Sequence, residues 1–356
     1  MNEHIVKTSL KSYPVYIGEG VIQQLPVFIK EKRASVTKIL IITDETVGEL
    51  YLSAILPLLS DFHVEIMKVP SGEKAKTFEI YYDCLTFALQ SKLDRHSLIL
   101  ALGGGAVGDL SGFVAATFMR GIPFIQIPTT ILAHDSAVGG KVAINHPEGK
   151  NMIGAFYQPE AVIYDTNFLN SLPLHEKRSG FAEVIKHGLI QDLSFYQWLQ
   201  NHISSLDTIR NDEMVGFLTR GIEIKSAIVA EDEKEAGIRA YLNFGHTLGH
   251  AIEAEMGYGK MTHGEAVLIG MLFALQLSEK YAGLEFDING LLEWVQKLGY
   301  QTEVPRELSY DRLIERMKGD KKSVGQQIRM VLLNEIGSPG LYEFSDEEIL
   351  SELSQF

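Results

Sequence analysis

The sequence predicts an α/β protein in which a helix-covered parallel sheet forms the first half and a largely helical domain follows. In the first half, short runs rich in β-branched residues alternate with helical stretches, as in a parallel sheet. These runs lie at 38–43, 62–69, 97–102, 124–128 and 161–165. Beyond about residue 171, segments of helical period follow one another with few strand-like runs. They lie at 179–191, 213–230, 243–256, 264–281 and 311–318.

Length and composition are those of a globular protein with two domains. The chain has 356 residues, of which 46% are hydrophobic and 22% charged, enough to bury a large core. It shows no internal repeat, low-complexity tract or long flexible linker. We therefore expect two closely packed domains, with a cleft between them, that meet near residue 171.

The charge and the chain start exclude several partner classes. A formal net charge of −14 disfavours nucleic acid and anionic membrane as partners. No apolar stretch reaches the roughly 18 residues of a membrane span, and residues 1–7 lack the basic start and apolar core of a signal peptide. We expect a cytoplasmic protein.

Cys84 is the only cysteine, so no intrachain disulfide is possible and a buried thiol without a role is expected.

A glycine-rich turn follows one of the apolar runs. After 97–102 come residues 103–109, in which Gly103, Gly105 and Gly108 fit the pattern G-x-G-x-x-G. Such a turn, between a buried strand and a helix, lets the backbone approach a pyrophosphate closely. The N–H groups at the helix start favour the negative charge. The turn therefore indicates a Rossmann-like nucleotide-binding domain.

The position of the acidic residue departs from the usual dinucleotide pattern. About 20 residues after the glycines, where an acid normally ends the second strand, the sequence has 124–130 without one. An acid, Asp44, instead ends an earlier strand-like run. We therefore expect a nucleotide domain with an altered strand order.

Candidate metal ligands lie in three apolar, helix-like segments of the second half. They are the carboxylate of Glu183 and the imidazoles of His246, His250 and His263. One carboxylate and two imidazoles would give a divalent ion three protein ligands and leave one position open, as a catalytic site requires. His246 and His250 share a helix face at i, i+4, but this spacing alone does not decide which two imidazoles bind.

Several basic residues stand in apolar or glycine-rich surroundings instead of in surface runs. Desolvating such a charge is costly unless something pairs with it. A multiply anionic small molecule would be a suitable partner. These residues are Arg120, Lys141, Lys150, Lys186, Lys225, Arg239 and Lys321.

Taken together, these motifs resemble the 3-dehydroquinate synthase family of the sugar phosphate cyclases, nearly from end to end. The matching stretches are 43–44, 70–74, 103–109, 118–121, 128–130, 135–141, 149–151, 182–186, 239–250, 263–265 and 320–322. The resemblance implies a dehydroquinate synthase-like fold. In it, residues 1–171 form the Rossmann-like NAD-binding domain, and residues 172–356 form the α-helical metal- and substrate-binding domain.

The resemblance also implies an activity. The family converts 3-deoxy-D-arabino-heptulosonate 7-phosphate into 3-dehydroquinate and phosphate, as a carbon–oxygen lyase of the shikimate pathway to chorismate and the aromatic amino acids. It uses NAD as a catalytic oxidant and a divalent metal, zinc or cobalt. A homodimer without nucleic-acid or membrane partners is implied.

Carried over residue by residue, the resemblance assigns metal, substrate and cofactor contacts. The metal ligands would be Glu183, His246 and His263, and His250 would face the substrate as a proton-transfer group. Arg239 and Lys225 would bind the substrate carboxylate. Its phosphate would be bound by Lys141, Asn151, Lys321 or Lys322, and by Arg120 from a partner subunit. Asp135, Lys186 and Asn243 would address the hydroxyls. The NAD-binding residues would be Asp44, Ser71, Gly72, Glu73, Lys74, Ala75, Lys76, Gly103, Gly104, Gly105, Ala106, Val107, Gly108, Asp109, Thr129, Thr130, Lys141, Lys150, Phe168, Leu169, Asn170 and Ser171.

Two other enzyme classes share parts of this pattern. An iron-type polyol or alcohol dehydrogenase would have the same two domains and metal site, but would release NADH at each turnover and leave Arg239, Lys225 and Lys321 without a purpose. Another sugar phosphate cyclase, such as an inosose synthase, would act on a substrate without a carboxylate. A non-enzymatic binding module is disfavoured, because redox, metal and anion sites occur together.

Overall fold

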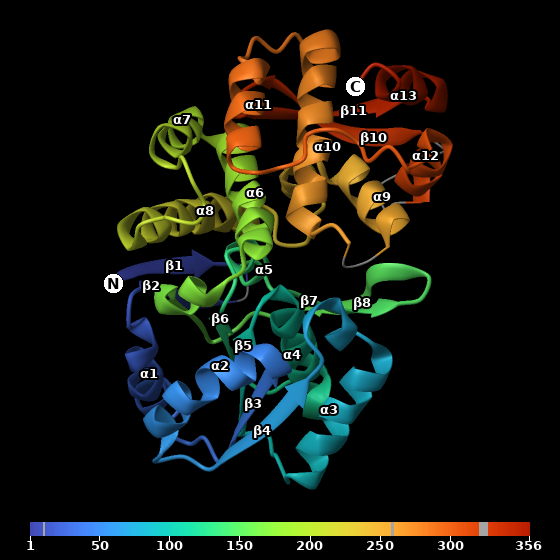
Figure 1. Ribbon diagram of the computed structural model, residues 1–356. Helices are drawn as coiled ribbons and strands as arrows, with labels where there is room; N and C mark the ends of the chain where they lie inside the picture. The colour runs from blue at the N-terminus through green and yellow to red at the C-terminus, as the bar shows by residue number, and fades with distance from the viewer. Residues whose placement is uncertain (10, 258–259, 320–326) are drawn as a thin grey trace. The chain divides into compact units, whose positions relative to one another are not determined.

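The computed structural model describes residues 1–9, 11–257, 260–319 and 327–356, and it divides into two compact units (Figure 1). The first unit comprises Met1–Leu172 and Met214–Glu233, and the second comprises Pro173–Glu213 and Lys234–Phe356. The chain leaves the first unit after Leu172 and returns to it once, for Met214–Glu233. A single boundary does not anticipate this return.

The first unit contains a seven-stranded sheet of order β1-β2-β9-β6-β5-β3-β4 (Figure 1). β1 pairs antiparallel with β2, and the other neighbouring pairs are parallel. All five predicted strands are present in this sheet, whereas β1, β2 and the separate hairpin β7-β8 were not predicted. The strands are β1 (Asn2–Lys7), β2 (Ser12–Gly18), β3 (Ile39–Asp44), β4 (Val64–Val69), β5 (Leu98–Gly103), β6 (Phe124–Pro128), β7 (Lys141–His146), β8 (Gly149–Phe156) and β9 (Ala161–Asp165).

Helices cover both faces of this sheet. Because successive side chains of a strand point to opposite faces, Ile41 packs with Leu52 of α2, whereas Ile42 packs with Cys84 of α3 and Val114 of α4. The helices of this unit are α1 (Gln24–Lys32), α2 (Glu45–Ile55), α3 (Phe78–Gln90), α4 (Gly105–Thr117), the short α5 (Ala133–Ser136) and most of α8 (Asn211–Glu231).

Polar contacts explain why α8 belongs to the first unit. Thr219 accepts a hydrogen bond from Asn2 at 3.2 Å, and Ser226 Oγ lies 2.7 Å from His4 Nε2 on β1. Lys225 of the same helix pairs with Asp135 at 2.8 Å. These contacts join positions 90 or more residues apart, which a reading of local periodicity does not detect.

The neighbouring strands β3 and β5 end at the switch point of the sheet. The helices that follow them, α2 and α4, lie on opposite faces, and the chain then continues in opposite directions across the sheet, to β4 and β6. Ligands of open α/β sheets bind outside the carboxyl ends of strands at such a point. Asp44 ends β3 and Gly103 ends β5. The expected altered order is thereby confirmed, because the glycine turn follows β5 and the acid ends the adjacent β3.

The second unit is largely helical, as predicted, and carries one hairpin that was not predicted. α10 lies at its centre, with 12 residues buried, as expected of a helix that is apolar on all sides. The elements are α6 (Leu174–Gln191), α7 (Leu193–His202), α9 (His246–Met256), α10 (His263–Leu277), α11 (Ile288–Lys297), α12 (Tyr310–Gly319), α13 (Asp346–Leu353), β10 (Ile328–Glu335) and β11 (Ser338–Phe344).

Short helical turns connect these elements. They are η1 (Val21–Gln23), η2 (Leu56–Leu59), η3 (Gly72–Ala75), η4 (Phe118–Arg120), η5 (Thr166–Ser171), η6 (Ile238–Asn243) and η7 (Ser278–Ala282). Within the described ranges, no helix has both the length and the apolar character needed to cross a bilayer.

Candidate active site

Four predicted side chains of the second unit converge on one point. The ligand atoms of His246, His250 and His263 all lie within 4.8 Å of one another. Glu183 Oε1 lies 3.5 Å from Nε2 of His246 and 3.5 Å from Nε2 of His263. Three helices, α6, α9 and α10, therefore bring one carboxylate and three imidazoles together.

The geometry of this cluster fits a divalent metal ion. Two ligand atoms that are each about 2.1 Å from a tetrahedral ion lie about 3.4 Å apart, close to both distances from Glu183. The second ring nitrogens are engaged elsewhere: His246 Nδ1 lies 3.1 Å from the carbonyl oxygen of Phe244, and His263 Nδ1 lies 3.1 Å from Glu253 Oε2. Both Nε2 atoms therefore face Glu183 Oε1, and an ion bound there would contact all three groups.

Glycines allow the helices that carry these ligands to approach closely. Gly245, the N-cap of α9, has a φ of +78°, and a Cβ there would lie 2.7 Å from Met271 N and from Val267 O of α10. A Cβ on Gly264 would lie 1.8 Å from the carbonyl oxygen of Ser179 of α6. Only glycine permits both approaches, which set the positions of His246 and His263 relative to Glu183.

The first turn of α10 is held by a hydrogen-bonded cap. Thr262 and Glu265 form a capping box around the helix start. The second oxygen of Glu265 accepts a hydrogen bond from Arg178 Nε of α6 at 2.7 Å. Because His263 lies between the two capping residues, its backbone is fixed relative to α6.

The cluster is buried and its charges are coupled. Lys186 donates a hydrogen bond to Glu183 Oε2, and both side chains are almost fully buried. Burial lowers the pKa of His246 well below its usual value. Burial would also lower the pKa of His263, but hydrogen bonds to Glu183 and Glu253 outweigh it and raise that pKa to about 9. Without a metal the site therefore holds a proton, which a divalent ion would displace.

The segment before α9 holds two further predicted residues. Arg239 is 1% exposed, and a guanidinium so deeply buried requires anionic or hydrogen-bonding partners. Asn243 donates from Nδ2 to Glu235 Oε1 at 3.2 Å. Lys321 and Lys322, predicted near the substrate phosphate, lie outside the described residues.

In the first unit, the glycine turn joins β5 to α4 as predicted. Gly104 is the N-cap of α4 and provides no side-chain hydrogen bond to the helix start, which leaves the terminal N–H groups for another acceptor. Beside the turn, the hydroxyls of Thr129, Thr130 and Ser136 are buried without a hydrogen-bond partner among the described residues. Buried hydroxyls of this kind are suited to a polar ligand.

Asp44 lies at the switch point and is mostly engaged through one oxygen. Its Oδ1 accepts from the backbone N–H of Val47, which caps α2, and from Ser71 Oγ, each at 3.0 Å. Thr46 Oγ1 lies 3.0 Å from the same Ser71 hydroxyl. The two hydrogen bonds to Oδ1 orient the carboxylate.

A buried lysine organises the polar group next to the turn. Lys76 is 2% exposed, and its Nζ donates to Asp109 Oδ2 at 2.6 Å and to Asn151 Oδ1. Burial raises the pKa of Asp109, with Lys76 opposing the shift. Lys150 Nζ lies 3.4 Å from Glu73 Oε1. Asp109 therefore lies against a cation, which offsets the repulsion that its charge would exert on a pyrophosphate.

Further predicted residues of the first unit lie at four places. Lys225 Nζ donates to the Asp135 carbonyl oxygen and, at 2.8 Å, to its carboxylate. The 168–171 stretch, with Leu169 and Asn170 inside it, is held by Tyr51, whose hydroxyl donates to the Phe168 carbonyl oxygen at 2.8 Å. Arg120 is exposed at the end of η4 with a φ of +68°, and Lys141 begins β7.

One residue of this cluster of candidate ligand side chains was missed by the sequence analysis. Glu253 was not singled out, although it follows His246 by seven residues and so shares its helix face. Its carboxylate is buried beside His263. Periodicity within α9 could have suggested it, but its partner on α10 is visible only in the fold.

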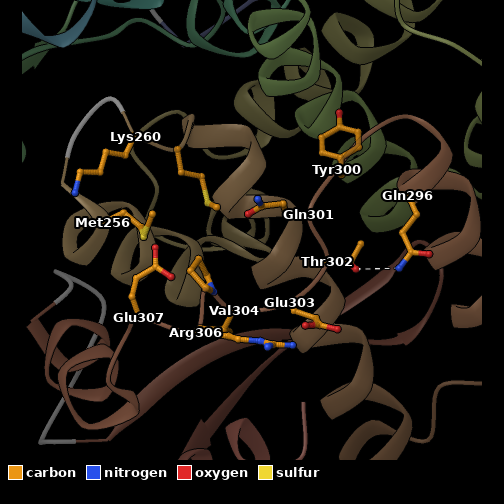
Figure 2. Close-up of a pocket in the computed structure, with 12 residues that line it drawn as sticks. Met256, Lys260, Gln296, Tyr300, Gln301, Thr302, Glu303, Val304, Arg306 and Glu307 are labelled. Carbon is orange, nitrogen blue, oxygen red and sulfur yellow. Dashed lines mark hydrogen bonds between the residues drawn. The ribbon is translucent and has the colours of Figure 1, made fainter.

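A separate hollow opens in the second unit (Figure 2). It has a volume of about 500 Å³ and includes none of the predicted site residues. Gln296 donates to Thr302 at 3.1 Å on its wall. The hollow is lined by Met256, Lys260, Met261, Gln296, Tyr300, Gln301, Thr302, Glu303, Val304, Pro305, Arg306 and Glu307.

Comparison with protein families and curated sequences gives matches along the whole chain. Residues 66–179 match the family described as 3-dehydroquinate synthase N-terminal, and residues 180–323 match 3-dehydroquinate synthase C-terminal. The 3-dehydroquinate synthase of Geobacillus thermodenitrificans is 54% identical over 100% of this chain and 98% of its own length. That of Bacillus cytotoxicus is 53% identical over 99% and 95%.

Solved structures with the same fold include two synthases and a reductase. A 2-deoxy-scyllo-inosose synthase complexed with carbaglucose-6-phosphate, NAD+ and Co2+ superposes with a TM-score of 0.91 at 25% identity, covering 99% of both chains. ValA, a 2-epi-5-epi-valiolone synthase from Streptomyces hygroscopicus with NAD+ and Zn2+ bound, gives 0.87 at 23%, covering 99% and 98%. A sulfoacetaldehyde reductase from Bifidobacterium kashiwanohense in complex with NAD+ gives 0.71 at 13%, covering 99% and 98%.

Proposed function

This chain belongs to the 3-dehydroquinate synthase family, and on that premise we propose how its residues carry out the family's reaction. The reaction converts 3-deoxy-D-arabino-heptulosonate 7-phosphate into 3-dehydroquinate and phosphate. The observation that carries the proposal is the buried Glu183, with Oε1 3.5 Å from Nε2 of both His246 and His263, in a chain 54% identical to a curated member.

The reaction needs both a redox cofactor and an electrophile. The C5 hydroxyl is oxidised to a ketone, which acidifies the neighbouring C6–H. Phosphate is then eliminated, and the ketone at C5 is reduced again. The sugar ring opens, and an intramolecular aldol step closes a new ring. Bound NAD supplies the hydride acceptor and donor, and a divalent ion supplies Lewis acidity. Because oxidation and reduction cancel, NAD is not consumed.

The first unit would bind NAD at the switch point. Asp44 would accept a hydrogen bond from the adenosine ribose, since its orientation is already set by Val47 and Ser71. The pyrophosphate would lie at the start of α4, where the helix N–H groups and the turn without side chains favour it. The buried hydroxyls of Thr129 and Thr130 would then gain partners.

The second unit would hold the metal through Glu183, His246 and His263. Lys186 neutralises part of the charge of Glu183. His250, whose ring centroid lies 5.2 Å from that of His246, would address a substrate hydroxyl and move a proton.

The anionic groups of the substrate require cations that are already held in place. For the carboxylate we propose Arg239 and Lys225, and for the hydroxyls Asp135 and Asn243 beside His250. For the phosphate we propose Lys141, Asn151, Lys321 and, from a partner subunit of a homodimer, Arg120. For Arg239 and Lys225 the support is their burial, because a buried cation binds an anionic group strongly where water is excluded. Arg120 and Lys141 are exposed, and the phosphate residues are proposed from the family resemblance.

Several broader assignments belong to the same proposal. We infer a carbon–oxygen lyase of the shikimate pathway that acts in the cytoplasm as a homodimer with zinc or cobalt. We also assign NAD binding to residues 1–171 and metal and substrate binding to residues 172–356. Most of α8, however, belongs to the first unit.

The two rival activities are not favoured. Curated relatives at 53–54% identity over nearly the whole chain are 3-dehydroquinate synthases. The inosose synthase and the reductase match at 25% and 13% identity, and the reductase match shows the fold alone.

The deciding experiment measures phosphate release from 3-deoxy-D-arabino-heptulosonate 7-phosphate with NAD far below the substrate concentration, while NADH absorbance is followed. We expect many turnovers of phosphate without lasting NADH. NADH formed in proportion to substrate would establish a dehydrogenase. No release from protein with bound metal and NAD would redirect the search to sugar phosphates that lack a carboxylate.

A further inference from the structure

We propose that Glu253 is a positioning residue of the metal centre, which orients the ring of His263 and strengthens metal binding. The proposal rests on the metal site of the proposed function. Glu253 Oε2 lies 3.1 Å from His263 Nδ1, while the Nε2 atom of the same ring lies 3.5 Å from Glu183 Oε1. The imidazole is therefore held between two carboxylates, one on each ring nitrogen.

The two metal-binding imidazoles are supported differently. His246 Nδ1 faces a neutral acceptor, the carbonyl oxygen of Phe244 in the turn before its own helix. His263 Nδ1 faces a charged acceptor on another helix. A hydrogen bond to a carboxylate is roughly twice as strong as one between neutral groups, and it increases the basicity of the imidazole as a ligand. His263 should therefore be the more strongly donating histidine.

The burial of Glu253 argues that this contact is built into the site. Only 6% of Glu253 is exposed, and a buried carboxylate is costly unless it is paired. The same helix carries His246, so Glu253 reaches from α9 to a ligand on α10 and couples the two ligand-bearing helices. Its neighbour Glu255 on α9 instead pairs with Arg316 at 2.7 Å, away from the cluster.

This difference between two carboxylates of one helix gives a matched pair of variants. Glu253→Gln keeps the size of the side chain and an acceptor oxygen but removes the charge, whereas Glu255→Gln makes the same change outside the cluster. Metal affinity is measured at fixed pH by competition with a chromophoric chelator, using Zn2+ and Co2+. We expect Glu253→Gln to bind about 10- to 100-fold more weakly and Glu255→Gln to bind like the unaltered protein.

A second readout separates positioning from a packing role. In the Co2+-loaded protein, visible absorption reports the ligand geometry, and we expect Glu253→Gln to shift this spectrum while Glu255→Gln does not. If Glu253→Gln does not fold, Glu253→Asp, which keeps the charge but withdraws it by one methylene, should weaken binding by a smaller factor.

Some results would overturn this proposal alone, and another would overturn the metal site together with it. Equal affinities and identical spectra for Glu253→Gln and the unaltered protein would show that Glu253 only packs. If the unaltered protein bound neither ion, the metal site itself and this proposal would both be wrong. Loss of phosphate release with unchanged metal affinity in the Glu253 variant would also refute the proposed role.

Discussion

The close approach of α9 to α10 can be tested by adding one methyl group at Gly245. In Gly245→Ala the new Cβ would lie 2.4 Å from Met271 Cγ and 2.7 Å from two backbone atoms of α10, while the residue keeps a φ of +78°. The left-handed backbone costs an alanine about 1–2 kcal/mol, and overpacking adds about 1–3 kcal/mol. We expect the free energy of unfolding to fall by about 2–5 kcal/mol in total.

Gly283→Ala provides the matched control. Gly283 has a similar φ of +72°, but nothing lies within 4 Å of the position that a Cβ would take there, so only the backbone cost of about 1–2 kcal/mol remains. Both tryptophans, Trp198 and Trp294, lie in the second unit. Urea unfolding followed by their fluorescence therefore reports the unit that carries both substitutions.

The comparison also has a functional readout. Because Gly245 directly precedes His246, the steric strain should displace this ligand, and metal affinity should fall in Gly245→Ala but not in Gly283→Ala. If the two variants lose the same stability and keep the same metal affinity, the tight contact between α9 and α10 does not position the site, and the packing argument is refuted.

Three further predictions follow from the site. Asp44→Asn should weaken NAD binding about tenfold, as expected for a lost charge-assisted hydrogen bond, and should reduce the ratio of NAD affinity to NADP affinity. Calorimetric titration with both cofactors measures the two affinities. An unchanged ratio would contradict the ribose assignment. The metal-free protein should lose stability as the pH rises from about 6.5 to about 9, because the pKa of His263 is raised in the folded state and its contribution is complete only below the unfolded value. Thermal unfolding across this pH range should show the decline in stability, and His263→Gln should abolish it. The pKa of His246 is lowered in the folded state, so its titration changes stability only at pH values below this range. Cys84 should react slowly with a thiol reagent at pH 8, since burial raises its pKa to about 12; rapid labelling of the folded protein would show that the thiol is accessible.

The agreement between sequence and structure is strongest where a local pattern has one physical cause. Residues 98–102, directly before Gly103, are all apolar because β5 is covered on both faces, so the segment could be recognised as a buried strand. The antiparallel pair β1-β2 and the hairpins β7-β8 and β10-β11 escaped prediction. Their partly exposed strands leave a weaker pattern of hydrophobicity.

The polar residues show the same division. The sequence places Asp109 in the glycine turn, where a pyrophosphate contact is the obvious prediction, but the structure pairs it with Lys76 from a distant segment. Lys225 and Asp135 were assigned to different groups of the substrate, whereas the structure joins them in one ion pair. Long-range pairs of this kind depend on how the elements pack, and composition or spacing does not reveal them.

The sequence by itself determined the βα alternation, the glycine turn, the helical second half and the types of residue able to bind a metal, because each depends on neighbours within one element. Only the tertiary structure decided which atoms meet. Helical spacing relates His246 to His250 within α9, but it does not relate either to Glu183 or His263 on other helices. Those distances depend on the close approach at Gly245 and Gly264, where the absence of a side chain lets three helices bring their ligands to one point.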